Sequence, residues 1–193
     1  DAAYAQEKGQ RIKLVAQAVK LNSGEVAAFV LPQFVPADNQ LFAVHNEYNG
    51  VIVETKLADK QFFYGKGAGR YPTASAVISD ISALRYDYRY EYRKLHSQAQ
   101  PALANAVYLS VYVSFPEWSH VNKWDFEEVT EFHSTQERQY LRGLIRAERL
   151  AGASWFSDPE VSVILQTEGV VEKDSVVQKN LRKISLQLAG VHN

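Results

Sequence analysis

Three glycines at alternate positions form the stretch of this chain whose spacing most suggests binding chemistry. Gly65, Gly67 and Gly69 lie within FFYGKGAGRYPTASAVISDI, residues 62–81. Because glycine has no Cβ, a backbone of this kind can pass very close to a ligand. A helix is expected directly after the loop, and its N-terminal amides suit a phosphate or a carboxylate. A strand-to-helix turn that needs positive φ explains the same glycines, so both interpretations stay open.

Neither common nucleotide-binding loop fits this stretch. Arg70 stands where a G-x-G-x-x-G dinucleotide fingerprint needs its third glycine. The loop also follows an expected hairpin instead of opening a βαβ unit, and no Gly-Lys-Ser/Thr supplies a P-loop. The spacing therefore indicates a binding loop of another kind, or only a turn.

Catalytic and metal-binding motifs are not recognisable elsewhere, so we predict no catalytic residue and no metal ligand in this chain. The absence of cysteine excludes disulfides, thiolate metal sites and a cysteine nucleophile. Ser75 and Ser79 lack a G-x-S-x-G elbow. One acidic group lacks metal-ligand spacing and is interpreted as a solvated face: Glu127, Glu128 and Glu131, with His133. The other histidines are scattered and suggest no site: His45, His96, His120 and His192.

A β-hairpin and a helix are expected to position the glycine loop. Residues 48–56 read as a strand, 57–60 as a turn and 61–67 as the hairpin partner. From Pro72 the apolar period changes from 2 to 3.6, which predicts a helix with Pro72 in its first turn. Its apolar stripe should pack on a sheet and comprises Ala74, Val77, Ile78, Ile81 and Leu84.

The segments before the hairpin alternate helix, strand and turn. Residues 1–8 predict the last turns of a helix, with Gly9 as its stop. Strands are predicted at 11–20 and 25–35, and Pro32 near the end of the second favours a sheet edge. Residues 41–44 predict a short helical turn.

The second half predicts a small module of its own. Strands are expected at 106–115 and 160–166, whereas 126–135 is ambiguous between helix and strand. Residues 139–150 begin as a strand and end as a short helix, Asp158-Pro159 is a turn, and 174–190 predicts a helix. The predicted fold class is therefore α+β: part of a mixed sheet with packing helices at 1–95, a linker at 96–105, and a small α+β sandwich at 106–193.

Charge gives no reason to invoke nucleic acid or a membrane. The formal net charge is −1, and no apolar run approaches the roughly 20 residues of a membrane span. The tyrosine-rich stretch at 85–94 fits a solvated connector. A nucleic-acid stacking surface is the alternative, which its mixed charges weaken.

Beyond spacing, YGKGAGRYPTASAVISDI resembles the glycine-loop segment of homoserine dehydrogenases, commonly Y-G-x-G-A-G-x-x-P-T-A-S-A-V-x-x-D. Two upstream segments follow in family order. Residues 9–18 resemble the G-x-x-I-K-L-L-A strand, and 30–54 resemble V-x-P-x-x-V…L-A-x-V-x-x-x-x-N-A-V, although Gly50 replaces the usual alanine. The resemblance covers about residues 1–86.

The resemblance implies an NAD- or NADP-dependent enzyme that interconverts L-homoserine and L-aspartate 4-semialdehyde. In that family the corresponding loop closes over the nicotinamide end of the cofactor. Gly67, Ala68 and Gly69 are carried over as cofactor-binding residues, together with Gly65, and Thr73 is expected to help shape the site. The family also implies a homodimer and a cytoplasmic location.

The same resemblance implies that parts of the enzyme are missing. The Rossmann domain and the catalytic lysine would precede Asp1, and the chain contains no methionine. We therefore expect a piece of a longer protein that is inactive alone, although a processed N-terminus would also explain the missing methionine.

Residues 106–193 occupy the position of the family's ACT regulatory domain, which implies an amino-acid effector such as threonine. PEWSHVNKWDF, however, replaces the usual D-x-P-G-V-L turn. The alternative function is a non-catalytic, amino-acid-binding regulatory or interaction module on the same fold.

Overall fold

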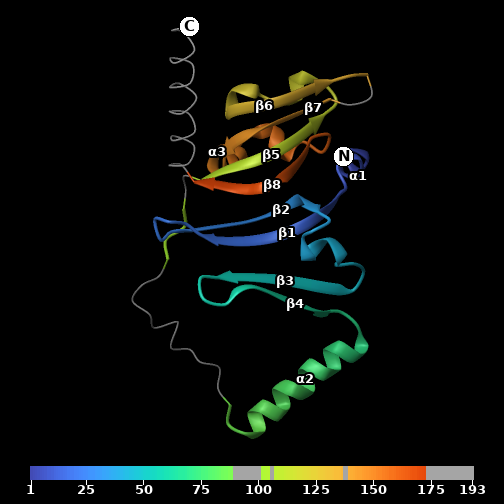
Figure 1. Ribbon diagram of the computed structural model, residues 1–193, viewed down its shortest axis with the longest axis vertical. Helices are drawn as coiled ribbons and strands as arrows, with labels where there is room; N and C mark the ends of the chain where they lie inside the picture. Colours follow the sequence, from blue (N-terminus) through green and yellow to red (C-terminus); the bar gives the residue numbers. More distant parts are fainter. Residues whose placement is uncertain (89–100, 105–106, 137–138, 173–193) are drawn as a thin grey trace. The chain divides into compact units, whose positions relative to one another are not determined.

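The computed structural model describes residues 1–88, 101–104, 107–136 and 139–172 (Figure 1). The chain divides into two compact units, and each is described by itself. Unit 1 combines Asp1–Val35 with the segment from Pro101 onward, and unit 2 spans Pro36–Gln100. The helix predicted at 174–190 and most of the stretches at 85–94 and 96–105 lie outside the described residues.

Unit 1 is built on a six-stranded mixed sheet with the order β1-β2-β8-β5-β7-β6. The pairs β5–β7, β5–β8 and β6–β7 are antiparallel, whereas β2 and β8 run parallel with Gln33 opposite Leu165. Its strands are β1 (Gln10–Lys20), β2 (Val26–Pro36), β5 (Val107–Phe115), β6 (Phe126–Ser134), β7 (Gln139–Arg146) and β8 (Ser162–Glu172). Its helices are α1 (Ala2–Glu7), α3 (Ala147–Gly152) and the 3-10 turns η3 (Trp118–His120), η4 (Lys123–Asp125) and η5 (Ser154–Ser157). The predicted α+β class with a mixed sheet is confirmed.

One sheet therefore collects strands from both sides of the predicted linker at 96–105. The placement of Pro32 at a sheet edge was wrong, because β2 lies between β1 and β8. The parallel β2–β8 pairing has its described register at Gln33, next to the proline. A proline removes one donor from a ladder, and a short pairing tolerates that loss.

The part of unit 1 from 107 to 172 follows the order strand, 3-10 turns, strand, strand, helix, strand. This is the βαββαβ order of a split βαβ motif, with η3 and η4 in the place of its first helix. The ambiguous stretch at 126–135 is the strand β6, at the edge of the sheet, where one face stays exposed and accepts charged residues.

Aromatic rings hold α1 against the sheet of unit 1. Tyr4 is buried, and its ring centroid lies 4.7 Å from that of Tyr112 and 5.5 Å from that of Phe34. Tyr140 completes this cluster at 4.9 Å from Tyr112. Because aromatic pairs at such distances add to simple area burial, α1 stays docked although it is short.

Unit 2 contains a hairpin and a helix. The 3-10 turn η1 (Gln40–Ala43) leads to β3 (Tyr48–Thr55), which pairs with β4 (Asp59–Lys66). The register runs from Tyr48 opposite Lys66 to Thr55 opposite Asp59. Asp59 adopts a φ of +55° in the tight turn. The predicted hairpin and the short helical turn are confirmed.

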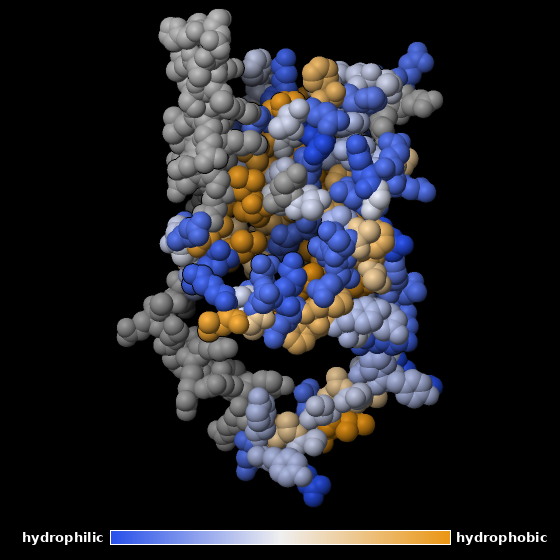
Figure 2. All heavy atoms as spheres, viewed as in Figure 1, coloured by the Kyte–Doolittle hydropathy of each residue, from blue (hydrophilic) through white to orange (hydrophobic). Residues whose placement is uncertain are grey.

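The helix α2 (Arg70–Arg85) forms where it was predicted, but the expected packing of its stripe was wrong. Val77, Ile78, Ile81 and Leu84 are 52–71% exposed, and α2 contains no buried residue. Figure 2 shows apolar atoms at the surface of this helix. A two-stranded hairpin offers little apolar surface, so the stripe stays uncovered in this chain.

None of the helices in the described part of the chain combines the length and the apolar character of a membrane span.

Candidate functional site

The glycine loop joins β4 to α2 and brings together all the predicted site residues. Gly65 lies in β4, Gly67 and Ala68 follow it, and Gly69 is the N-cap of α2. Thr73 lies in the first turn of the helix, where its backbone N–H donates to the Gly69 carbonyl at 3.1 Å. The structure thus places these residues on one short segment. Their role in binding a cofactor stays a prediction.

Gly69 has a backbone conformation that only glycine adopts readily. Its φ is +117° and its ψ is 153°. This region is essentially closed to residues with a Cβ, and occupying it costs about 1–3 kcal/mol. Space is not the constraint, since an added Cβ would only touch Pro72 at 3.5 Å. The glycine therefore turns the chain sharply from the strand into the helix.

Gly67 is required for a different reason, which is close packing. A Cβ at this position would lie 1.7 Å from the side-chain nitrogen of Asn49. The Gly67 N–H donates to the carbonyl of Glu47 at 3.3 Å. Any side chain here would have to displace the Asn49 amide, so the loop lies directly against the start of β3.

An ion pair and two stacked rings brace the base of the loop. Lys66 Nζ lies 2.8 Å from Glu47 Oε1 and 5.2 Å from the centre of the Tyr48 ring. The rings of Tyr48 and Tyr64 stack at 4.8 Å. The hydrogen bond from Lys66 lowers the pKa of Glu47, and the bond to Glu47 raises the pKa of Lys66.

The electrostatics of the loop favour an anion. No acidic residue lies in the first turn of α2, and Arg70 begins the helix. The Arg70 guanidinium lies over the Tyr71 ring and donates to the Tyr71 hydroxyl at 2.7 Å. Free amides at a helix N-terminus together with a nearby cation suit a phosphate or a carboxylate.

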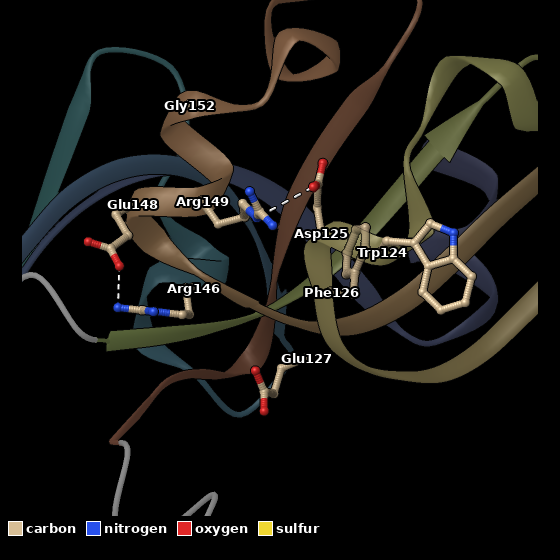
Figure 3. A pocket seen from close by; sticks show the side chains of 8 residues that line it. All are labelled: Trp124, Asp125, Phe126, Glu127, Arg146, Glu148, Arg149 and Gly152. Atoms are coloured by element: carbon tan, nitrogen blue, oxygen red, sulfur yellow. Dashed lines mark ion pairs between the residues drawn. The ribbon is translucent and has the colours of Figure 1, made fainter.

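A second feature, in unit 1, is an open hollow of about 610 Å³ between η4, the start of β6 and α3 (Figure 3). Arg149 Nε lies 3.5 Å from Asp125 Oδ1, and Arg146 pairs with Glu148. The hollow thus offers charges of both signs beside an aromatic wall. Its lining residues are Trp124, Asp125, Phe126, Glu127, Arg146, Glu148, Arg149 and Gly152.

A polar cluster extends across the strands β6, β7, β8 and β5 of unit 1. Tyr140 donates to Glu131 Oε1 at 2.7 Å, and Arg142 donates to Glu131 Oε2 at 2.9 Å. Arg142 also donates to Gln166 at 2.6 Å, and buried Gln166 donates to the Val111 carbonyl. The hydrogen bond from Tyr140, and then Arg142, lowers the pKa of Glu131 against the opposing effect of burial. Glu131, which the sequence places in a solvated face, is therefore partly buried and held by Tyr140 and Arg142.

A third cluster was missed by sequence reasoning, which left His120 without a site. His120 Nδ1 lies 3.0 Å from Asp158 Oδ2, and Glu160 offers a further carboxylate, with all three potential ligand atoms within 4.8 Å of one another. His120 is 38 residues away from Asp158 in the sequence, and Asp158 and Glu160 on their own carry no motif. Only the fold, which places η3 beside the turn before β8, could have revealed them.

Comparison with known proteins gives a consistent family for the first part of the chain. The family model for homoserine dehydrogenase matches residues 1–82. The homoserine dehydrogenase of Corynebacterium glutamicum is 39% identical over 85 residues, and that of Synechocystis is 44% identical over 85 residues. Each alignment covers 42% of this chain and 19% of the relative, so the matched segment spans about a fifth of the length of these curated relatives.

A solved structure shares the fold over a longer stretch. A homoserine dehydrogenase from Thiobacillus denitrificans superposes with a TM-score of 0.58 at 21% identity, over 86% of this chain and 44% of that one. At this identity the likeness concerns the fold alone. The family assignment therefore rests on the sequence matches, in which residues 1–82 match the homoserine dehydrogenase family model and the curated homoserine dehydrogenases align over 85 residues.

Proposed function

We propose that this chain is part of an NAD(P)-dependent homoserine dehydrogenase, which interconverts L-homoserine and L-aspartate 4-semialdehyde by hydride transfer. The observation that carries the proposal is the loop Gly67-Ala68-Gly69, which enters α2 through a glycine-only conformation within the family-matched segment. The nicotinamide supplies the hydride chemistry, and the loop's part is to lie close against the cofactor.

The loop supports this role through three properties. Its glycines place no side chain over the backbone, α2 presents an N-terminal end without an acidic residue in its first turn, and Lys66, which pairs with Glu47, and Arg70 flank the segment. An anionic group of a dinucleotide, or the substrate carboxylate, fits such surroundings. Since the matched segment covers about a fifth of the relatives, we propose that the rest of the catalytic machinery lies in other parts of a longer protein and that this chain alone is inactive.

The test is homoserine-dependent reduction of NAD and of NADP by the full-length protein, with and without Gly69→Val. Because a β-branched residue cannot adopt the Gly69 conformation without strain, we expect kcat/KM to fall by at least about tenfold, which corresponds to 1.4 kcal/mol. Ser79→Ala, on the exposed face of α2, is the matched control and should keep full activity. Equal activity in Gly69→Val and the unaltered protein would overturn the role of the loop.

A second candidate is a regulatory module that binds an amino acid, on the same fold. The observation in its favour is the βαββαβ order of residues 107–172, which is compatible with an ACT-like domain, together with the hollow beside α3. Arg149 could receive an α-carboxylate and Asp125 or Glu148 an α-ammonium. Each ion pair would have to open for this, so we expect weak binding.

Calorimetric titration of the whole chain with L-threonine tests the second candidate. Saturable binding that Arg149→Gln weakens would support it, and the absence of any heat up to about 1 mM ligand, the range of −4 kcal/mol binding, would count against it. The family also motivates the proposal of a cytoplasmic homodimer, which sedimentation of the full-length protein would test as a doubled mass.

A further inference from the structure

We propose that His120, Asp158 and Glu160 form a binding site for a divalent transition-metal ion. The ion would join the β5–β6 connection to the α3–β8 connection. This site lies outside the glycine loop and does not depend on the proposed dehydrogenase function. It brings one imidazole and two carboxylates together from segments that only the fold makes neighbours.

The donor atoms already have a spacing that a single ion can use. His120 Nδ1 and Asp158 Oδ2 are 3.0 Å apart. Ligands about 2.1 Å from a tetrahedral ion lie roughly 3.4 Å from one another, so these two atoms need to separate only slightly. The Glu160 carboxylate lies within 4.8 Å of both and belongs to an exposed side chain that can rotate inward.

The charges of the cluster are incompletely balanced. Asp158 Oδ1 accepts a hydrogen bond from the Glu160 backbone N–H at 2.9 Å, which fixes the Asp158 carboxylate. The carboxylate of Glu160 itself has no hydrogen-bond or ion-pair partner among the described residues. Two carboxylates this close repel each other, and a bound cation would offset that repulsion.

The chemistry of the donors indicates the class of ion. Imidazole suits zinc and the neighbouring transition metals, whereas sites made only of oxygen suit calcium and magnesium. Half-buried His120 and Asp158 provide partial shielding from water, and the exposed side of Glu160 leaves room for a water ligand. A zinc-like ion with three protein ligands and one water fits this arrangement.

The ion would have a structural effect on unit 1. His120 ends η3, in the connection between β5 and β6, whereas Asp158 follows η5, in the connection between α3 and β8. A shared ion would cross-link these two connections. Its binding free energy would therefore add to the stability of the folded module.

The experiment titrates the whole chain with zinc chloride in a calorimeter and records thermal unfolding with and without the ion. We expect one equivalent of zinc to bind and to raise the unfolding temperature. His120→Ala and Asp158→Asn should each weaken binding by at least about tenfold. His133→Ala is the matched control, because His133 in β6 stacks on Tyr140 of β7 and its loss should leave zinc affinity unchanged.

Two results would overturn the proposal. One is the absence of binding by the unaltered chain at about 1 mM zinc, and the other is binding that survives His120→Ala at unchanged affinity, which assigns the zinc to other histidines. If His120→Ala fails to fold, Glu160→Gln replaces it, since Glu160 is exposed and its loss leaves the His120–Asp158 pair intact. Unweakened binding by Glu160→Gln would remove that residue from the site and refute the three-ligand arrangement.

Discussion

Units 1 and 2 differ in where they keep their apolar side chains. In unit 1, β5 and β7 place large residues such as Tyr112, Leu141 and Ile145 at 0% exposure. In unit 2, the apolar stripe of α2 remains exposed, including Leu84 at 71%. The central strands of a six-stranded sheet have neighbours and packing elements that cover their apolar side chains, whereas a two-stranded hairpin offers little apolar surface to a helix. The comparison shows that similar sequence patterns lead to burial only where a partner surface exists.

The strongest test of this contrast compares two leucines. Leu141→Ala should lower the free energy of unfolding of unit 1 by about 2–5 kcal/mol, because it leaves a cavity in a close-packed core. Leu84→Ala should change stability by less than about 0.5 kcal/mol. Urea unfolding followed by tryptophan fluorescence reports on unit 1, since Trp118, Trp124 and Trp155 all belong to it, and far-UV circular dichroism follows the helix α2 of unit 2. Similar losses in both variants would contradict the contrast.

Glycines in unit 1 sharpen the comparison at the level of the backbone. An added Cβ at Gly143 would lie 2.6 Å from the carbonyl oxygen of Glu128, on the adjacent strand β6. Because backbone cannot move aside cheaply, Gly143→Ala should cost about 1–3 kcal/mol in a thermal unfolding experiment. Gly152→Ala is the control, with open space around its Cβ. An unchanged unfolding temperature for Gly143→Ala would show that the β6–β7 pairing is more adaptable than this geometry indicates.

A matching pair of glycines tests the small core of unit 2. A Cβ at Gly50 would lie 2.7 Å from Val44 and 2.9 Å from Phe62, whereas Gly65 has nothing within 4 Å. Gly50→Ala should therefore cost about 1 kcal/mol of hairpin stability, seen as faster amide hydrogen exchange in β3 and β4, and Gly65→Ala should leave exchange nearly unchanged. Equal exchange rates would mean that the contacts of Val44 and Phe62 do not hold the hairpin.

The smallest expected effect concerns pH and the polar cluster of unit 1. The pKa of Glu131 is lowered in the folded state by Tyr140 and Arg142. Its contribution to stability is therefore present above its ordinary pKa of 4.5 and is lost as pH falls through the lowered folded value. Glu131→Gln should reduce stability by less than about 1 kcal/mol at neutral pH, because the side chain is partly exposed.

Chemical unfolding of both proteins from pH 7 down to pH 3 checks this sign. The two stabilities should converge as the solution becomes more acidic. A gap that stays constant with pH would assign the effect of Glu131→Gln to packing and not to charge. Tyr140→Phe is the companion variant, since it removes the largest cause of the lowered pKa and keeps the ring in the aromatic cluster.

Local patterns predicted the elements of this fold better than their partners. The hairpin of β3 and β4 followed from alternation on either side of a turn, and the change at Arg146 from strand to helix followed from the pattern of residues 139–150. The pairing of β2 with β8 could not be predicted, because no local signal links Gln33 to Leu165. The exposure of the α2 stripe was also not predicted, because an apolar stripe in the sequence does not say whether a surface exists to cover it.

The candidate sites divide in the same way. The glycine loop was visible in the sequence because one continuous segment carries its whole geometry, including the positive φ of Gly69. The cluster of His120, Asp158 and Glu160 was not visible in the sequence, because His120 comes from one connection of the chain and the two acids from another. The hollow beside α3 likewise combines residues of η4 with residues of α3.

The parallel pairing of β2 with β8 has a consequence for how the protein folds. All of unit 2 lies between β2 and β5 in the chain, so the two halves of the sheet can join only after a long loop closes. Closing that loop costs conformational entropy before the β2–β8 hydrogen bonds form to offset the cost. Pairing between β2 and β8 is therefore expected to be slow. The antiparallel strands β5 to β8 can assemble from nearer neighbours, so the addition of β1 and β2 should be a late step. During that interval the open edge of β8 would be free to pair with another chain, and the speed of sheet closure would then govern the yield of soluble protein.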